Sequence, residues 1–203
     1  VFTLIATGIY SCSDEFLDET ENYNIDSENF FNSEEDYYLA LVGAYDLLQA
    51  SYVNVLLGEI ASDNTLCGGE SATDVVGFQQ IDDMGHTEVN SNLRDIWSWM
   101  FAGVSRTNYF LENQNKTAFD GRDAMVAEAR FLRAYYHFEL VKWFGGIPIK
   151  NYEAALEGAG ERFVPGDELA IARSSSAQVY ALIESDLIYA VNNLEYTAPQ
   201  VGR

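Results

Sequence analysis

Apolar residues recur at intervals of three and four along much of the chain, the spacing of one face of an α-helix. Ser33 and Asp36 stand at the two ends of a capping-box pattern, with acidic residues suited to the positive end of a helix. The apolar positions after them predict a helix to about Tyr52 and a short continuation through 53–61.

The same spacing returns in three later segments. Helices are predicted over 92–112 and 122–144, and the short break between them makes this pair antiparallel. Gly145-Gly146 and Pro148 end the second helix. A last helix is predicted from the Ser174–Ser176 cluster. Its predicted core-facing stripe is Tyr180, Ile183, Leu187, Val191 and Leu194.

Two stretches lack this periodicity and are predicted to be long loops. One runs from Ser62 to about Val89 and contains several glycines, and the other runs from Lys150 to Arg173. Long loops in compact domains often carry function. Strong strand alternation is absent, so the predicted fold class is all-α: helical hairpins with long loops, similar to tetratricopeptide-type repeats.

The helix predicted over 122–144 is apolar around most of its circumference. Its predicted seam is Met125, Ala129, Leu132, Tyr136 and Leu140, widened by Phe131, Tyr135, Phe138 and Val141. So broad an arc predicts burial on more than one side. Arg130, Arg133 and Glu139 interrupt it, and Glu139 is expected to pair with Lys142 on an exposed edge.

The first residues have the pattern of a secretion signal. Val1–Ile9 is apolar and uncharged, too short to span a bilayer as a helix, and small residues precede Cys12. This is typical of a bacterial lipoprotein cleavage site with a lipid-bearing cysteine. The basic start of such a signal is missing, so we expect 1–12 to be a truncated signal. The alternative is a buried strand that ends in a core cysteine.

Residues 13–32 are polar and aperiodic and are predicted to be an acidic tether to a helical domain at 33–203. One acylated cysteine would hold that domain at a membrane surface. The chain carries 11 basic and 32 acidic residues, a net charge of −21, and no Lys or Arg precedes Arg94. This acidity excludes DNA and RNA as general electrostatic partners.

The sequence contains no nucleophile motif, phosphate-binding loop or zinc spacing. His86 and His137 are far apart, without Cys or His neighbours that would complete a metal site. Asp82 and Asp83 are adjacent and point apart, whereas a glycosidase needs two carboxylates that flank one bond. We therefore predict a protein that is not an enzyme and has no cofactor or metal.

The segment Glu128–Pro148, EARFLRAYYHFELVKWFGGIP, resembles the signature helix of the SusD/RagB family. Further segments resemble the family in the same order: Cys12–Asp18, Ser33–Asp46, Ala61–Asn64, Asn108, and Ser176–Tyr180 with Asp186. The resemblance implies an outer-membrane lipoprotein of Bacteroidota that captures nutrients, mostly glycans. Family members are much longer, so 33–203 resembles their N-terminal region and is expected to be incomplete at its C-terminus.

The resemblance also implies a mechanism and a partner. The protein would capture an oligosaccharide or other nutrient at the cell surface and deliver it to a TonB-dependent outer-membrane transporter of the SusC type. A different function stays open from the residues: a helical-repeat scaffold for proteins, or a peptide-binding member with no glycan ligand.

Sugar recognition generally needs an aromatic platform and planar hydrogen-bonding side chains, and the first long loop offers both. The candidate ligand-binding residues are Asp63, Asn64, Asp74, Phe78, Gln79 and His86. Trp97 and Trp99 are expected to pack in the core, and Glu128–Pro148 is expected to be scaffold. The starch-binding family member uses a Trp on its early loop, and none occurs here between Cys12 and Trp97, which argues against starch.

Overall fold

The structure, a computed structural model, describes residues 30–71 and 73–197. The predicted signal at 1–12, with its predicted lipidation site Cys12, and nearly all of the predicted tether lie outside the described residues. The elements are α1 (Glu34–Asp46), the 3₁₀ turn η2 (Leu47–Ala50), α2 (Ser51–Ile60), α3 (Val76–Asp82), α4 (Ser91–Glu112), α5 (Arg122–Phe144), α6 (Tyr152–Leu156), α7 (Asp167–Ala170) and α8 (Ser176–Asn193). They confirm the all-α prediction.

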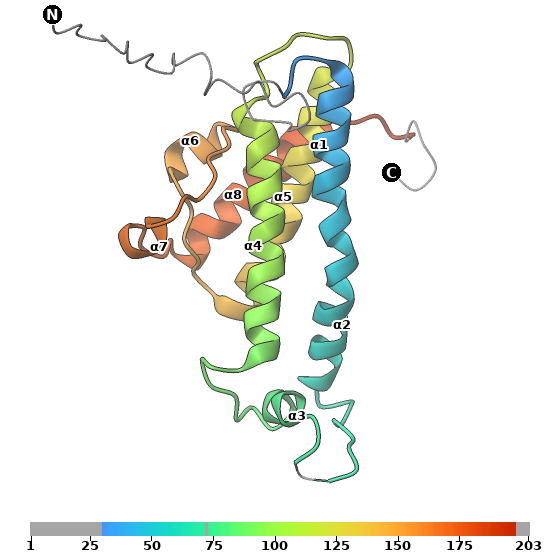
Figure 1. The fold of residues 1–203 in the computed structure, drawn as a ribbon, viewed down its shortest axis with the longest axis vertical. Coiled ribbons are helices and arrows are strands. Elements are labelled where there is room, and N and C mark those ends of the chain that lie inside the picture. Colours follow the sequence, from blue (N-terminus) through green and yellow to red (C-terminus); the bar gives the residue numbers. More distant parts are fainter. Residues whose placement is uncertain (1–29, 72, 198–203) are drawn as a thin grey trace, which may run out of the picture. The chain divides into compact units, whose positions relative to one another are not determined.

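Three long segments form the frame of the unit that starts at Phe31. The run α1–η2–α2 lies beside α4, and α4 and α5 form the predicted antiparallel hairpin (Figure 1). The most extensive packing is that of α5 against α8 and α4. Gly103 on α4 permits this approach, because a Cβ there would lie 2.7 Å from the ring of Tyr136 on α5.

The predicted helix ends are largely confirmed, and the internal breaks differ. The Ser33 hydroxyl accepts from the Asp36 amide at 3.3 Å, and Asp36 accepts from the Ser33 amide at 2.9 Å, which completes the capping box. The first helix does not run unbroken to Tyr52, because η2 interrupts it. The loop predicted over 62–89 also contains the short helix α3, which begins after Val75 with a left-handed backbone.

The run Glu34–Ile60 is long and apolar enough to cross a membrane. A single such run near the N-terminus is weak evidence that it does so. One side of this run packs in the protein. Its buried residues are Tyr37, Leu41, Ala44, Asn54, Leu57 and Ile60. Its outer face leaves Leu39, Val42, Tyr52 and Val55 exposed.

The predicted seam of α5 is confirmed for Ala129, Leu132, Tyr136 and Leu140, which are buried. The widened arc is wrong at Phe131 and Phe138, which are 44% and 41% exposed. Polar residues, instead of these two aromatic ones, occupy the second buried side of α5. Arg130, Arg133, His137 and Glu139 are all buried.

The buried carboxylate of Asp186 on α8 is the acceptor for both arginines of α5. Arg133 donates Nε to Oδ2 at 2.7 Å and Nη2 to Oδ1 at 2.8 Å, while Arg130 donates Nε to Oδ1 at 2.7 Å. The remaining donors of Arg133 reach the carbonyls of Ala159 at 2.6 Å and Ala155 at 3.0 Å. One cluster therefore joins α5, α8 and the segment around α6.

Glu139 corrects a second expectation. It pairs with Lys142 at 2.7 Å as predicted, but its side chain is buried because α2 covers it. Asn54 of α2 donates its Nδ2 to the other carboxylate oxygen of Glu139. The edge predicted to be exposed is therefore a polar contact between two helices.

The face of α8 that packs in the core is not the predicted one. Val179, Leu182, Asp186 and Ala190 are buried with Ile183, whereas the other members of the predicted stripe are half-buried or exposed. Val191, for example, is 80% exposed. Both stripes have helical spacing, and α5 packs on the one that contains Asp186. The second apolar stripe of α8 has no neighbour among the described residues that buries it.

Replacing Asp186 by Ala tests the central cluster. The change leaves two buried guanidinium groups without their carboxylate, so we expect the free energy of unfolding to fall by about 3–5 kcal/mol. Urea unfolding measures this. The control is Asp46→Ala, which breaks the exposed pair with Arg106 at 2.9 Å and should cost at most about 1 kcal/mol. Equal effects of the two changes would contradict the central role of Asp186.

His137 gives the protein a specific acid sensitivity. It is buried, its Nδ1 donates to the Arg133 carbonyl at 2.9 Å, and burial followed by the charge of Arg133 lowers its pKa from 6.5 to about 4. The unfolded state therefore takes up a proton between pH 6.5 and 4 that the native state does not. We expect this residue to remove about 3 kcal/mol of stability as pH falls through that window.

Comparison of pH-dependent urea unfolding between the wild type and His137→Gln isolates this contribution. The variant should lose less stability than the wild type between pH 6.5 and 4. His86→Gln, which removes an exposed histidine, is the matched control variant. Parallel pH curves for the wild type and His137→Gln would show that His137 titrates normally.

Candidate functional site

A cavity lies where α4 begins and α5 ends. It has a volume of about 600 Å³ and is lined by His86, Thr87, Glu88, Leu93, Arg94, Trp97, Trp143, Phe144 and Arg173. A second cavity of about 400 Å³ shares Trp97 and Arg173 and adds Phe101, Ser105, Pro148, Phe163, Asp167 and Ile171. We call the two cavities together the Trp97 groove.

A row of aromatic rings follows the groove. Trp97 is half-buried, with its ring centroid 4.5 Å from that of Phe101 and 5.0 Å from that of Phe144, the second pair edge to face. Phe163 continues the row, 5.8 Å from Phe101. Because Trp97 and Phe101 are one helical turn apart on α4, a rigid helix sets their spacing.

The turn after α5 brings a distant segment to this row. Gly145 has φ of 66°, which stops the helix, and Gly146 leaves no room for a Cβ beside the Ser174 carbonyl. Pro148 and Arg173 then form an isolated antiparallel bridge, and the Ser174 amide donates to the Ile147 carbonyl at 2.9 Å. Residues separated by the second long loop thus meet beside Trp97.

Arg173 is held in place by the end of α5. Its Nη1 donates to the carbonyls of Phe144 at 3.2 Å and Gly146 at 3.0 Å. Its guanidinium carbon lies 5.7 Å from the centroid of Trp97, within the range of a cation–π contact. The groove therefore has a positive group fixed beside its central ring.

An ion-pair cluster braces the loop that carries Phe163. Lys150 donates to Asp167 at 2.8 Å and pairs with Glu161 at 3.2 Å. The hydrogen bond from Lys150 lowers the pKa of the Asp167 carboxyl, and the bond to Asp167 raises the pKa of Lys150. Both groups stay charged at neutral pH, so this side of the second cavity keeps its geometry.

Of the six predicted ligand-binding residues, only His86 lines the groove. Asp63 and Asn64 lie in an exposed turn after α2. Gln79 donates to the carbonyls of Asp74 at 2.7 Å and Ser71 at 3.1 Å, and Asp74 accepts from the Glu70 amide at 3.2 Å. Phe78 lies half-buried on α3. The structure does not bring the six together, and their contact with ligand stays a prediction.

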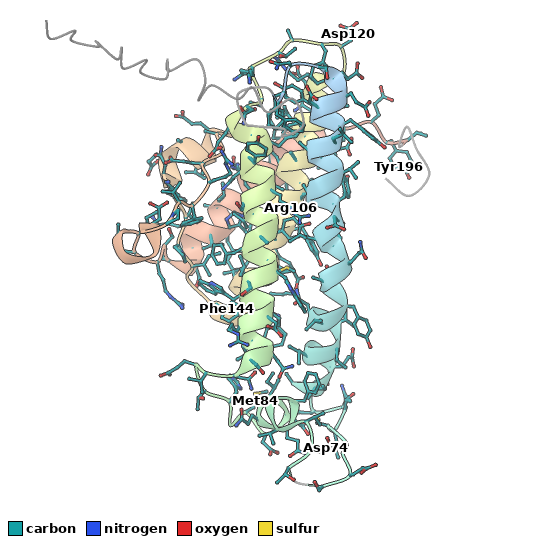
Figure 2. All side chains as sticks on the ribbon, in the orientation of Figure 1. Asp74, Met84, Arg106, Asp120, Phe144 and Tyr196 are labelled. Atoms are coloured by element: carbon teal, nitrogen blue, oxygen red, sulfur yellow. The ribbon has the colours of Figure 1, made fainter. Side chains whose placement is uncertain are left out.

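The labelled residues of Figure 2 show this separation: Asp74 and Met84 lie at the α3 end, and Phe144 lies farther along the α4–α5 hairpin. Sequence reasoning missed Trp97, Trp143, Phe144 and Arg173. Core packing was expected for Trp97, which is only half-buried, and for Trp99, which is 39% exposed. The available signal was the Trp97–Phe101 pair, one helical turn apart.

The signature segment Glu128–Pro148 therefore has two roles. Over most of its length it is buried scaffold, as expected. Its end supplies Trp143, Phe144 and Pro148 to the groove. The groove offers ring faces and polar side chains, and in the described ranges 30–71 and 73–197 no three His, Cys, Asp or Glu side chains gather as a metal site.

Comparison with known proteins places these features in a family. A SusD-like family model, described as starch-binding associating with outer membrane, matches residues 15–199. The SusD-like protein P25 of Formosa agariphila is 24% identical over 222 residues, which cover 100% of this chain and 39% of the relative. The SusD-like protein P38 of the same organism is 26% identical over 193 residues, 94% of this chain and 36% of the relative.

Solved structures share the fold. A SusD superfamily protein from Bacteroides vulgatus matches with a TM-score of 0.67 and 23% identity, over 83% of this chain and 36% of that chain. Surface glycan-binding protein A from Bacteroides uniformis matches with a TM-score of 0.64 and 24% identity, over 79% of this chain and 34% of that chain. The chain thus spans between a third and two fifths of the length of these proteins.

Gly146→Ala tests how the turn forms the groove. The new methyl group would meet the Ser174 carbonyl, so the segment with Arg173 must shift, and we expect a loss of about 1–3 kcal/mol of stability. Near-UV circular dichroism should also change, because Trp97 lies beside this turn. The control Gly43→Ala adds a methyl group in open space within α1 and should stabilise by about 0.5–1 kcal/mol. Unchanged stability and spectrum for Gly146→Ala would contradict the close approach.

Proposed function

The chain belongs to the SusD-like family, and on that premise we propose that it is part of a cell-surface protein that binds glycans in the Trp97 groove. The protein captures an oligosaccharide without breaking a bond. It then delivers the sugar to a TonB-dependent transporter of the SusC type in the outer membrane. Acylation of Cys12 anchors the protein there, and residues 13–32 link the anchor to the helical domain.

The observation that carries the proposal is the half-buried ring of Trp97 in a cavity of about 600 Å³. Apolar ring faces suit the C–H faces of a sugar, and half-burial holds the ring rigid while one part stays accessible. The second Trp of this cavity, Trp143, comes from α5. Ser105 and His86 add hydrogen-bonding groups at the two ends of the groove.

In this proposal the six loop residues predicted from the sequence supplement the contacts made by the aromatic rings of the groove. His86 contacts the ligand in the groove, and Asp63, Asn64, Asp74, Phe78 and Gln79 serve a more distant part of a long glycan. The name of one structural neighbour, a surface glycan-binding protein, supports the class of ligand.

One observation favours a second function, that of a protein-interaction scaffold. The outer face of α8 forms a shallow apolar cavity of about 510 Å³, lined by Tyr180, Ile183, Glu184, Leu187, Ile188, Val191 and Asn192. Exposed apolar surface of this kind is typical of protein contacts. A scaffold would bind a protein or peptide there and leave the Trp97 groove without a sugar.

Affinity electrophoresis of the full-length protein against a panel of polysaccharides separates the two functions. We expect retardation by at least one polysaccharide, with no sugar product released. Trp97→Ala and Trp143→Ala should weaken that binding by about tenfold or more, because each removes a ring face that the sugar contacts. Isothermal titration with the matching oligosaccharide gives the dissociation constants.

The matched control is Trp99→Ala, which removes an indole ring that lines neither cavity of the groove. Its affinity should equal that of the wild type. If no polysaccharide retards the protein, or if Trp99→Ala weakens binding as much as Trp97→Ala, glycan binding in this groove is wrong and the scaffold function gains support.

A further inference from the structure

Two arginines of the groove stand out in a chain with a net charge of −21. Most basic side chains in 30–71 and 73–197 form an ion pair with a carboxylate: Arg106, Arg122, Arg130, Arg133, Lys142, Lys150 and Arg162. Arg94 and Arg173 have no such carboxylate among these residues, and both line the 600 Å³ cavity. The whole chain has 32 acidic and 11 basic residues, whereas this cavity is lined by two arginines and one glutamate.

Arg173 is arranged to bind an anion with two hydrogen bonds. Its Nη1 is occupied by the carbonyls of Phe144 and Gly146, which orient the guanidinium plane. No described residue accepts from its Nε or Nη2. These two N–H groups form the fork that fits two oxygens of a carboxylate or sulfate. The carbonyls thus fix the group and leave its binding edge available.

Arg94 adds a second positive charge from the first turn of α4. Its guanidinium is exposed and has no hydrogen bond or ion pair with the described residues. Glu88 is the carboxylate that lines the same cavity, and it lies beyond ion-pair distance from both arginines. The cavity therefore combines two positive charges, one negative charge and two Trp rings.

We propose that the Trp97 groove binds an acidic glycan, with the carboxylate or sulfate groups of the sugar held by Arg173 and Arg94. The sugar rings pack on Trp97 and Trp143. This inference rests on the proposed function and specifies its ligand class. The net charge of −21 makes general attraction of a polyanion unfavourable, so binding of an acidic glycan must come from these local groups.

The test compares matched pairs of oligosaccharides that differ only in charge, using the full-length protein and isothermal titration. One pair is oligogalacturonate and its methyl ester, and the other is a carrageenan oligosaccharide and its desulfated form. We expect the charged member of at least one pair to bind about tenfold or more tightly, as charge-assisted hydrogen bonds require. The pair that responds identifies the anion as carboxylate or sulfate.

Arg94→Ala and Arg173→Ala should each remove most of this preference, measured in each variant as the ratio of the affinities for the charged and neutral members of a pair. Arg122→Ala is the matched control, since it removes the same charge from the opposite end of α5 and should keep the preference. Arg173→Ala also loses two hydrogen bonds to the end of α5. If that variant is unstable, the result for Arg94→Ala, which loses no such hydrogen bond, is decisive.

Equal affinity for charged and neutral members would overturn the acidic-glycan inference and leave glycan binding intact. A preference that survives in Arg94→Ala and in a folded Arg173→Ala would also overturn it. If no polysaccharide of either charge binds, the proposed function fails together with the inference.

Discussion

The carboxylate of Asp186 is the contact on which the rest of the structure depends. It accepts hydrogen bonds from two arginines on another helix and is itself fully buried. A buried ion pair contributes little net stability compared with a well-packed apolar core, but it is costly to leave half-made. The packing of α8 on α5 is therefore restricted to the arrangement that places Asp186 between Arg130 and Arg133.

This restriction extends to the groove. Helix α5, whose Arg130 and Arg133 bind Asp186 of α8, ends in Trp143 and Phe144, and its antiparallel neighbour α4 presents Trp97 at the same end. The aromatic surface is thus built on two long helices, and Arg133, which binds Asp186, also donates to Asn108 of α4 at 3.4 Å. Asn54 and Glu139 make a further polar contact that holds α2 against α5. The side-chain oxygen of Asn54 is buried and has no hydrogen-bond partner among the described residues, a cost that tight packing elsewhere must offset.

The sequence was informative wherever local chemistry decides the outcome. The capping box at Ser33, the Gly-Gly stop after Phe144 and the bounds of α5 all depend on neighbours within one helical turn. The break at η2 and the short α3 were missed, because the first lies inside a continuous apolar pattern and the second starts at Val75, which has no capping side chain.

Burial was predicted less well because it depends on partners distant in sequence. Two stripes of α8 have helical spacing, and the buried stripe is the one that contains Asp186, whose partners on α5 are distant in sequence. By its spacing on α4, Trp97 fits a seam that faces the core. Its actual neighbours, the turn after α5 and Arg173, are distant in sequence and leave it half-buried beside a cavity. A groove assembled from residues 86–105, 143–148 and 163–173 has no signature in any one stretch.

Arg133 holds the second long loop in a way that leaves its sequence free to diverge. It binds the carbonyls of Ala155 and Ala159, which every amino acid supplies, so the anchor survives most substitutions in the loop. Gly158 and Gly160 are the exceptions, since a Cβ at Gly158 would lie 2.8 Å from Arg130 and one at Gly160 would meet the Asn108 carbonyl. Beyond these two glycines, the bonds from Arg133 to the backbone of 155–159 do not depend on which side chains the loop carries. The fold thereby separates the attachment of this loop to the core from the identity of the loop's exposed side chains.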